Sequence, residues 1–123
     1  MKTNNQRQHE PVIRSITEQD YIEMFGTKPQ YTLRGYASEL DGEVLGVAGV
    51  FHSRPLSAFS KLKPDMKLHK RSVVVAVRKF RELLNSFYDE VFAAPEEGEE
   101  SAERFLKHVG FRKLHDGVFV WQK

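Results

Sequence analysis

The sequence PDMKLHKRS, at residues 64–72, has the residue types of an anion site. It brings Lys67, Lys70 and Arg71 close to an apolar, helix-like run that begins at Val73. Cationic side chains and the free backbone N–H groups at a helix N-terminus both attract phosphate oxygens. The stretch has no glycine, the residue whose backbone freedom lets a loop close tightly around a phosphate. It therefore predicts anion binding without a tight glycine-rich loop.

Candidate catalytic groups are few, and the catalytic residues stay unknown at this point. His52 follows an apolar run and is the one candidate for a general base, with an exposed loop histidine as the alternative. His69 lies in the basic stretch and is expected to contact either phosphate or solvent. His108 and His115 are interpreted as surface residues. The chain has no cysteine and no metal-ligand spacing, so we predict neither a thiolate nucleophile nor a metal site.

The composition indicates one ordinary globular domain. The 123 residues are 40% hydrophobic and 29% charged, enough for a single core. We expect residues 1–10 to form a flexible polar tail and residues 11–123 to form the domain. No run approaches the roughly 18 apolar residues of a membrane span, so no span is expected. The lack of cysteine fits a reducing cytoplasm.

Charge is unevenly spread along the chain. Basic residues crowd residues 61–81, and four acids gather at Glu96, Glu97, Glu99 and Glu100. The net charge of +2 is small, and no aromatic residues interleave with the basic face. We therefore interpret the basic residues as a solvated helix face, with nucleic-acid contact as the less favoured alternative. The acidic cluster is expected to solvate a loop and to favour the N-terminus of the last helix.

Hydrophobic periodicity and turn residues predict the order of the elements. Thr17 is the expected N-cap of a first helix, and Asp41-Gly42 and Asp116-Gly117 are expected hairpin turns. Strands are predicted at residues 12–16, 31–40, 43–51, 56–62 and 88–94 and on both sides of the last turn, and helices at residues 18–25, 72–87 and 101–109. This order indicates an α+β (mixed α/β) domain with a mostly antiparallel sheet.

Two segments and their order resemble the GNAT (N-acetyltransferase) superfamily. VIRSITEQDY is similar to the start of many members, and SAERFLKHVGF is similar to their last helix, which commonly ends before Gly-Phe. The resemblance covers residues 12–123 and implies a twisted sheet with helices on both faces. It also implies acetyl-CoA as the cofactor, bound where the fourth and fifth strands splay apart, with its pyrophosphate on the following helix N-terminus. One helix of the family is expected to be reduced or missing before the second strand.

The resemblance also assigns the cofactor loop. The loop of the family runs roughly hydrophobic-x-Pro-x-x-Arg-Gly-x-Gly-x-Gly, and Pro64 and Lys67 keep its proline and its cation. Leu68, Lys70 and Ser72 stand where the family has glycines, so the loop is degenerate. The implied cofactor-binding residues are Leu62, Lys67, Leu68, His69, Lys70, Arg71 and Ser72. A serine at the last position can cap a helix.

The groups that usually move protons in this family are missing. The family often has a glutamate on the fourth strand, but residues 56–62 contain no acid. Its usual tyrosine on the last helix corresponds to Leu106. One interpretation is an acyl-CoA N-acyltransferase that positions an amine acceptor and leaves proton transfer to solvent. The alternative is a non-enzymatic module that keeps the fold.

A finer resemblance concerns VRKFRELLNSFYDE and ERFLKHVGF. These segments look like the small GNAT-like proteins of tailed bacteriophages, including the internal virion protein A group. The matching residues are Arg78 to Arg81 and Arg104 to Lys107. The resemblance implies a phage origin, phage structural proteins as partners, and a location in the host cytoplasm or the virion.

Overall fold

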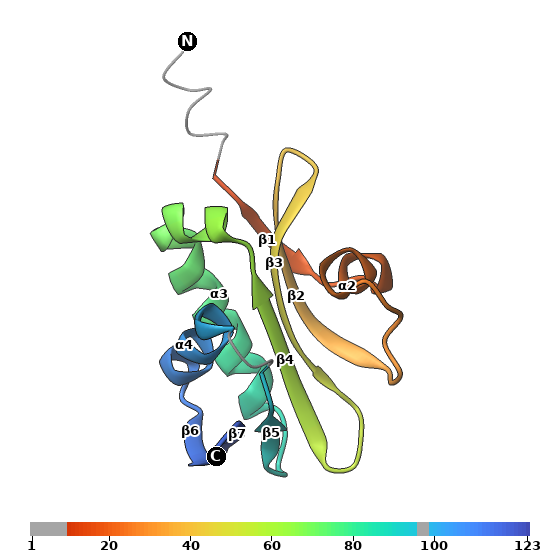
Figure 1. The fold of residues 1–123 in the computed structure, drawn as a ribbon, viewed down its shortest axis with the longest axis vertical. Coiled ribbons are helices and arrows are strands. Elements are labelled where there is room, and N and C mark those ends of the chain that lie inside the picture. Colours follow the sequence, from red (N-terminus) through yellow and green to blue (C-terminus); the bar gives the residue numbers. More distant parts are fainter. Residues whose placement is uncertain (1–9, 96–98) are drawn as a thin grey trace.

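The computed structural model describes residues 10–95 and 99–123, which contain one seven-stranded sheet (Figure 1). The strands are β1 (Val12–Ser15), β2 (Leu33–Leu40), β3 (Glu43–Phe51), β4 (Leu56–Leu62), β5 (Val91–Ala93), β6 (Arg112–His115) and β7 (Val118–Trp121). The helices are α2 (Glu18–Phe25), the 3₁₀ helix η1 (Pro64–Leu68), α3 (Lys70–Asn85) and α4 (Glu100–Val109). The predicted tail at residues 1–10 lies outside the described residues except for Glu10, and Glu96 and Glu97 of the acidic cluster lie outside them too. The predicted α+β class is confirmed.

The sheet runs in the order β1-β2-β3-β4-β5-β7-β6. Every neighbouring pair in it is antiparallel except β4 with β5. The β2–β3 turn has Asp41 at φ 51° and Gly42 at φ 83°. Both residues are left-handed, as a type I′ turn requires, and the Asp-Gly signal in the sequence correctly located this hairpin.

Helices cover both faces of the sheet, as predicted. α2 lies on one face, and α3 and α4 lie on the other (Figure 1). The α2 face has a small core, which consists of Met24, Ala37, Val44, Val47 and Phe59. The larger core lies under α3 and α4, and its fully buried side chains include Phe80, Leu84, Leu106 and Phe119. In the described chain, α2 is followed directly by β2, so the expected reduction of one helix is observed there.

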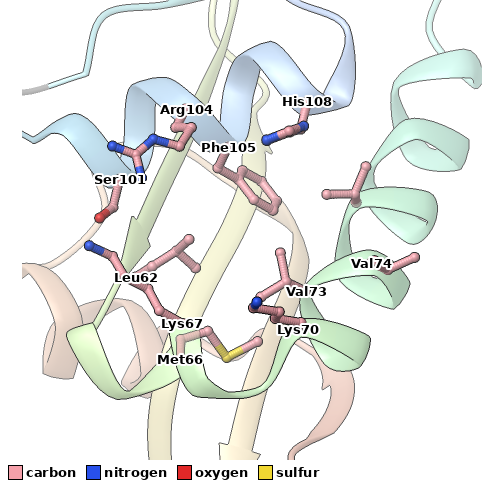
Figure 2. Close-up of a pocket in the computed structure, with 11 residues that line it drawn as sticks. Leu62, Met66, Lys67, Lys70, Val73, Val74, Ser101, Arg104, Phe105 and His108 are labelled. Carbon is pink, nitrogen blue, oxygen red and sulfur yellow. The ribbon is translucent and has the colours of Figure 1, made fainter.

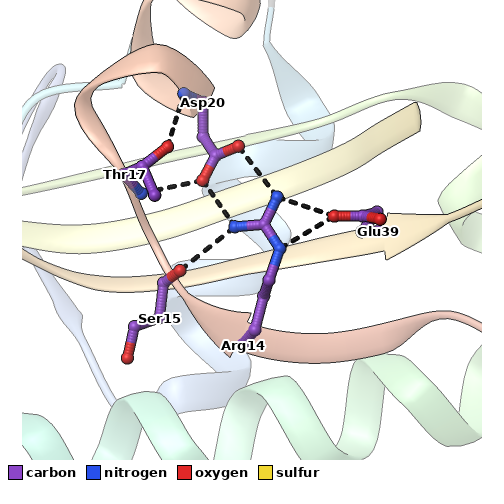
Figure 3. A network of polar contacts seen from close by, with 5 residues as sticks. All are labelled: Arg14, Ser15, Thr17, Asp20 and Glu39. Carbon is purple, nitrogen blue, oxygen red and sulfur yellow. Dashed lines mark hydrogen bonds and ion pairs between the residues drawn. The ribbon is translucent and has the colours of Figure 1, made fainter. Parts of the chain in front are cut away.

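Polar contacts around Arg14 join β1, α2 and β2 (Figure 3). The Arg14 guanidinium donates to both carboxylate oxygens of Asp20, at 2.7 and 2.9 Å, and to Glu39 Oε1 at 2.8 Å. Asp20 also accepts from the Thr17 backbone N–H at 2.7 Å, while its own N–H donates to Thr17 Oγ1 at 3.2 Å. This reciprocal capping box starts α2 at the predicted residue.

The network shifts the ionisation of both partners. The hydrogen bond from Arg14 lowers the pKa of the Asp20 carboxyl below its ordinary 3.8, although burial opposes the shift. The hydrogen bond from Asp20, followed by that from Glu39, raises the pKa of Arg14. Because the folded-state pKa of Asp20 is lowered, its contribution to stability is complete above about pH 4 and is lost as pH falls through the folded-state value.

Replacing Asp20 by Asn is expected to destabilise the fold by about 2 kcal/mol at pH 7, because it removes charge-assisted hydrogen bonds that are partly buried. The difference in free energy of unfolding between wild type and Asp20→Asn should shrink below about pH 4. Urea denaturation at several pH values measures both effects. Glu18→Gln, an exposed change in the same helical turn, is the control and should have little effect at either pH. Equal destabilisation by the two variants would contradict the role given to the network.

Candidate cofactor pocket

β4 pairs with the parallel strand β5 over only part of its own length. β4 and β5 pair at Leu56 with Val91, Ser57 with Phe92 and Ala58 with Ala93, after which β5 ends. β4 continues from Phe59 to Leu62, paired on its other side with β3. The β5-facing edge of this part of β4 therefore leaves peptide groups without a strand partner. The divergence implied by the resemblance is present, and it opens at the carboxyl ends of the two strands.

The basic stretch that follows β4 is mostly helical. Pro64 is the first residue of η1. Its missing backbone N–H costs no hydrogen bond there, because the first N–H groups of a helix have no partner within the helix. Met66 in the middle of η1 is only 1% exposed and accepts a hydrogen bond from the Ser38 hydroxyl at its Sδ atom, at 3.3 Å. This buried side chain fixes the turn against the sheet.

α3 begins at Lys70, two residues earlier than predicted, with His69 as its N-cap. The apolar periodicity could not detect this start because Lys70 and Arg71 contribute no apolar side chain to the helix face. Ser72, a residue type that can cap a helix, is not the N-cap here and lies buried inside the first turn. The first intrahelical bond runs from the Val73 N–H to the His69 carbonyl at 3.1 Å. The N–H groups of residues 70–72 precede it and are the free amides of this N-terminus.

A pocket of about 580 Å³ lies between η1, the first half of α3 and α4, beside the end of β4 (Figure 2). Its apolar lining consists of Leu62, Met66, Val73, Val74, Val77 and Phe105. Its polar lining consists of Lys67, Lys70, Ser101, Arg104 and His108. No aspartate or glutamate of the described chain lines it. The pocket thus suits a ligand with an apolar or weakly polar body and anionic ends.

The structure separates the residues implied for the cofactor loop into two groups. Leu62, Lys67 and Lys70 line the pocket. Leu68, which replaces the first glycine of the family loop, is 78% exposed and lies outside the lining. Arg71 is also exposed outside it, and the His69 ring contacts Glu10, with Nδ1 3.4 Å from Oε2. The replacement at residue 68 therefore does not fill the pocket, and the one at residue 70 adds a cation to it.

The sequence reasoning missed the contribution of α4 to this pocket. Ser101, Arg104, Phe105 and His108 are spaced at i, i+3, i+4 and i+7, so they share one helix face. His108 is exposed, as predicted for a surface residue, but it also lines the pocket. The spacing was a usable signal, whereas the location of that face depends on tertiary packing.

The Ser60 side chain of β4 lies beside the opening between β4 and β5. Its hydroxyl is buried and has no hydrogen-bond partner among the described residues. Ser60 lies beyond the last β4–β5 pair and on the same strand face as Leu62, which lines the pocket. A buried hydroxyl without a partner costs roughly 1–3 kcal/mol. A polar ligand group that reaches this depth would relieve that cost. A ligand with amides and phosphates, as coenzyme A has, therefore fits the residues present.

The positions that the resemblance assigns to the general acid and the general base carry no such group. Leu106, at the position of the usual tyrosine, is 1% exposed in the core, and β4 carries no carboxylate. His52 lies beside the other end of β4, in a separate hollow of about 820 Å³ with Tyr88, Asp89 and Glu90. The structure thus does not bring His52 together with the basic stretch.

The described residues show neither a membrane-spanning helix nor a metal cluster. No helix among them is long and apolar enough to cross a bilayer. No group of three or more His, Cys, Asp or Glu side chains in residues 10–95 and 99–123 is placed to hold a metal ion.

A mostly antiparallel sheet whose single parallel pair diverges next to a helix N-terminus defines the GNAT fold, and the chain has this fold. No protein-family model and no curated protein matches the sequence. Among solved structures, three of the aminoglycoside acetyltransferase AAC(6′)-Ib are similar to it. The complex with coenzyme A has a TM-score of 0.58 at 19% identity, over 93% of this chain and 95% of that one.

The other two structures agree with this result. The complex with coenzyme A and kanamycin gives a TM-score of 0.59 at 18% identity, over 93% of this chain and 95% of that one. The complex with paromomycin and acetyl-CoA gives a TM-score of 0.54 at 19% identity, over 90% of each chain. At these identities the likeness shows the fold alone.

Proposed function

We propose that the protein binds an acyl-CoA, with acetyl-CoA as the reference ligand, and transfers the acyl group to an amine acceptor. The observation that carries the proposal is the pocket at the divergence of β4 and β5, which has cations and a helix N-terminus at its mouth and no acid in its described lining. The likeness to structures that contain coenzyme A or acetyl-CoA supports the same ligand class.

The residues of the pocket correspond to different parts of such a ligand. The amides of residues 70–72, with Lys67 and Lys70, suit the pyrophosphate, and this assignment retains part of the loop implied by the sequence. The apolar lining suits the pantetheine arm. The amides of that arm can pair with the free edge of β4, as an extended peptide pairs with a strand edge. Ser60 then gains a polar partner.

The chemistry required of the chain is mainly positioning. The acceptor nitrogen attacks the thioester carbonyl carbon, so that a C–N bond forms and the C–S bond breaks. The proton lost by the nitrogen passes to solvent, and the departing thiolate takes a proton from solvent. Holding the two reactants in line can supply a large part of the rate without a dedicated base or acid.

A second candidate is a non-enzymatic module, of the kind found among the GNAT-like proteins of tailed phages, whose partners would be phage structural proteins. The observation that favours it is the burial of Leu106 together with the absence of an acid on β4. Under this candidate the pocket binds its ligand and no acyl transfer follows.

Calorimetric titration of the full chain with coenzyme A tests the proposal. The expected Kd is in the micromolar range, which corresponds to a binding free energy of about −8 kcal/mol. Release of free thiol from acetyl-CoA, followed with a panel of primary amines that includes kanamycin, tests transfer. Binding with transfer supports the enzyme, and binding without transfer to any amine supports the second candidate. Absence of binding at millimolar coenzyme A would overturn the assignment of the pocket.

A further inference from the structure

The basic side chains of the pocket come from three elements. Lys67 belongs to η1, Lys70 to the first turn of α3, and Arg104 and His108 to α4. In Figure 2 Arg104 and His108 project from α4, Lys70 lies across Phe105 from them, and the Lys67 side chain runs past Leu62 toward Ser101. A single phosphate at the N-terminus of α3 leaves the α4 pair without a role. Two basic groups facing one pocket indicate a ligand with two separate anionic groups.

Coenzyme A has such a charge distribution, because it carries a 3′-phosphate on the ribose in addition to its pyrophosphate. We propose that Arg104, assisted by His108 one turn further along α4, binds this 3′-phosphate and makes the protein selective for coenzyme A over 3′-dephospho-coenzyme A. The inference rests on the proposed function, since it names the second anion subsite of the same pocket.

The present contacts of Arg104 leave it free to take this role. Among the described residues Arg104 pairs with Glu100 at 3.9 Å, and the two side chains are 62% and 87% exposed. An exposed pair at this distance contributes little, so a phosphate dianion displaces the carboxylate at small cost. The planar guanidinium donates two parallel hydrogen bonds to phosphate oxygens, which a lysine in its place could not do.

The neighbouring Lys107 provides a matched control. It lies on the same helix with the same charge, contacts Glu103 at 3.6 Å and does not line the pocket. Long-range attraction of an anion to α4 would depend on Lys107 and Arg104 alike, whereas a specific contact depends on Arg104 alone.

The experiment measures the Kd of coenzyme A and of 3′-dephospho-coenzyme A for wild type, Arg104→Gln, His108→Asn and Lys107→Gln. Wild type is expected to bind coenzyme A about tenfold more tightly than the dephospho form, the effect of one charge-assisted hydrogen-bonded contact. Arg104→Gln should abolish most of this preference and leave the affinity for the dephospho form unchanged. His108→Asn should reduce the preference in part, and Lys107→Gln should preserve it.

Equal wild-type affinity for the two ligands would overturn the 3′-phosphate subsite and leave the proposed function intact. Equal weakening of both ligands by Arg104→Gln would also overturn it, since Arg104 would then contact a different part of the molecule. Failure of wild type to bind either ligand would overturn the proposed function itself, and with it this inference.

Discussion

Reversing the charge of Lys67 and Lys70 together is expected to weaken coenzyme A binding by at least about 100-fold. Each lysine lines the pocket beside the free amides of α3, and each hydrogen bond to a phosphate contributes roughly 1.5–3 kcal/mol. The double variant Lys67→Glu/Lys70→Glu loses both contacts and adds two repulsive charges, so a loss of more than about 3 kcal/mol is expected. Calorimetric titration at fixed ionic strength measures the effect.

Two single variants control for changes in net charge. Lys28 lies on the surface between α2 and β2, so the Lys28→Glu variant should bind coenzyme A as wild type does. Arg71→Glu tests the position that the sequence favoured and the pocket does not include, so its loss should stay within about fivefold, the range of a screened surface charge. A loss with Arg71→Glu as large as that of the double variant would show that net charge, and not the pocket contacts, controls binding.

A large loss of stability is expected from a side chain at Gly49, in the centre of β3. Gly49 pairs with Gly35 of β2, and a Cβ atom at residue 49 would lie 2.5 Å from the Arg34 carbonyl oxygen and 2.6 Å from Phe59 Cζ. Phe59 cannot move easily, because its ring contacts those of Tyr21, Phe25 and Phe51. Gly49→Ala is therefore expected to lower the free energy of unfolding by about 3 kcal/mol or more. Urea denaturation measures the change.

Gly46 on the same strand is the matched control for this substitution. A Cβ atom there would meet the end of the Leu62 side chain at 2.7 Å, and the nearest backbone atom would be 3.4 Å away. A terminal methyl group can rotate, so Gly46→Ala should cost about 1 kcal/mol or less. Equal stability of Gly49→Ala and Gly46→Ala would show that residue 49 does not need glycine for the close approach of the strands.

The sequence alone predicted the features that are determined by residues close to one another in the chain. Thr17 and Asp20 form the start of α2 by bonding to each other, and Asp41 with Gly42 forms its turn through its own backbone preferences. Alternation of apolar residues located β4 at the observed residues. The fifth strand was predicted too long, since only residues 91–93 pair and Tyr88 is 92% exposed.

Features that depend on distant contacts were beyond local reasoning. Arg14 bonds to Glu39 across 25 positions, and the sulfur of the buried Met66 accepts a hydrogen bond from Ser38, 28 positions away. The basic stretch was predicted as a loop because nothing near Met66 in the sequence shows that its side chain reaches the core. That contact converts the stretch into η1 and directs Leu68 away from the pocket.

The sequence indicated where the candidate site lies, but it did not indicate all of the residues that line it. The basic residues before α3 indicated an anion site, and Lys67 and Lys70 do line the pocket. The second set of cations lies more than thirty residues later, and its role depends on how α4 packs against β4 and α3. The absence of the usual base and acid was visible in the sequence, whereas the isolation of His52 at the far end of β4 required the structure.

The incomplete pairing of β4 also matters for solubility. The β5-facing edge of residues 59–62 has no strand partner, although the other edge pairs with β3, and a free strand edge is the kind of surface that recruits strands from other chains. α4 packs over this part of the molecule, and Lys61 and Lys63 place charges beside it, both of which discourage self-association. The opening proposed for the ligand is thus also a free strand edge, and we expect that loosening α4 would expose it to self-association.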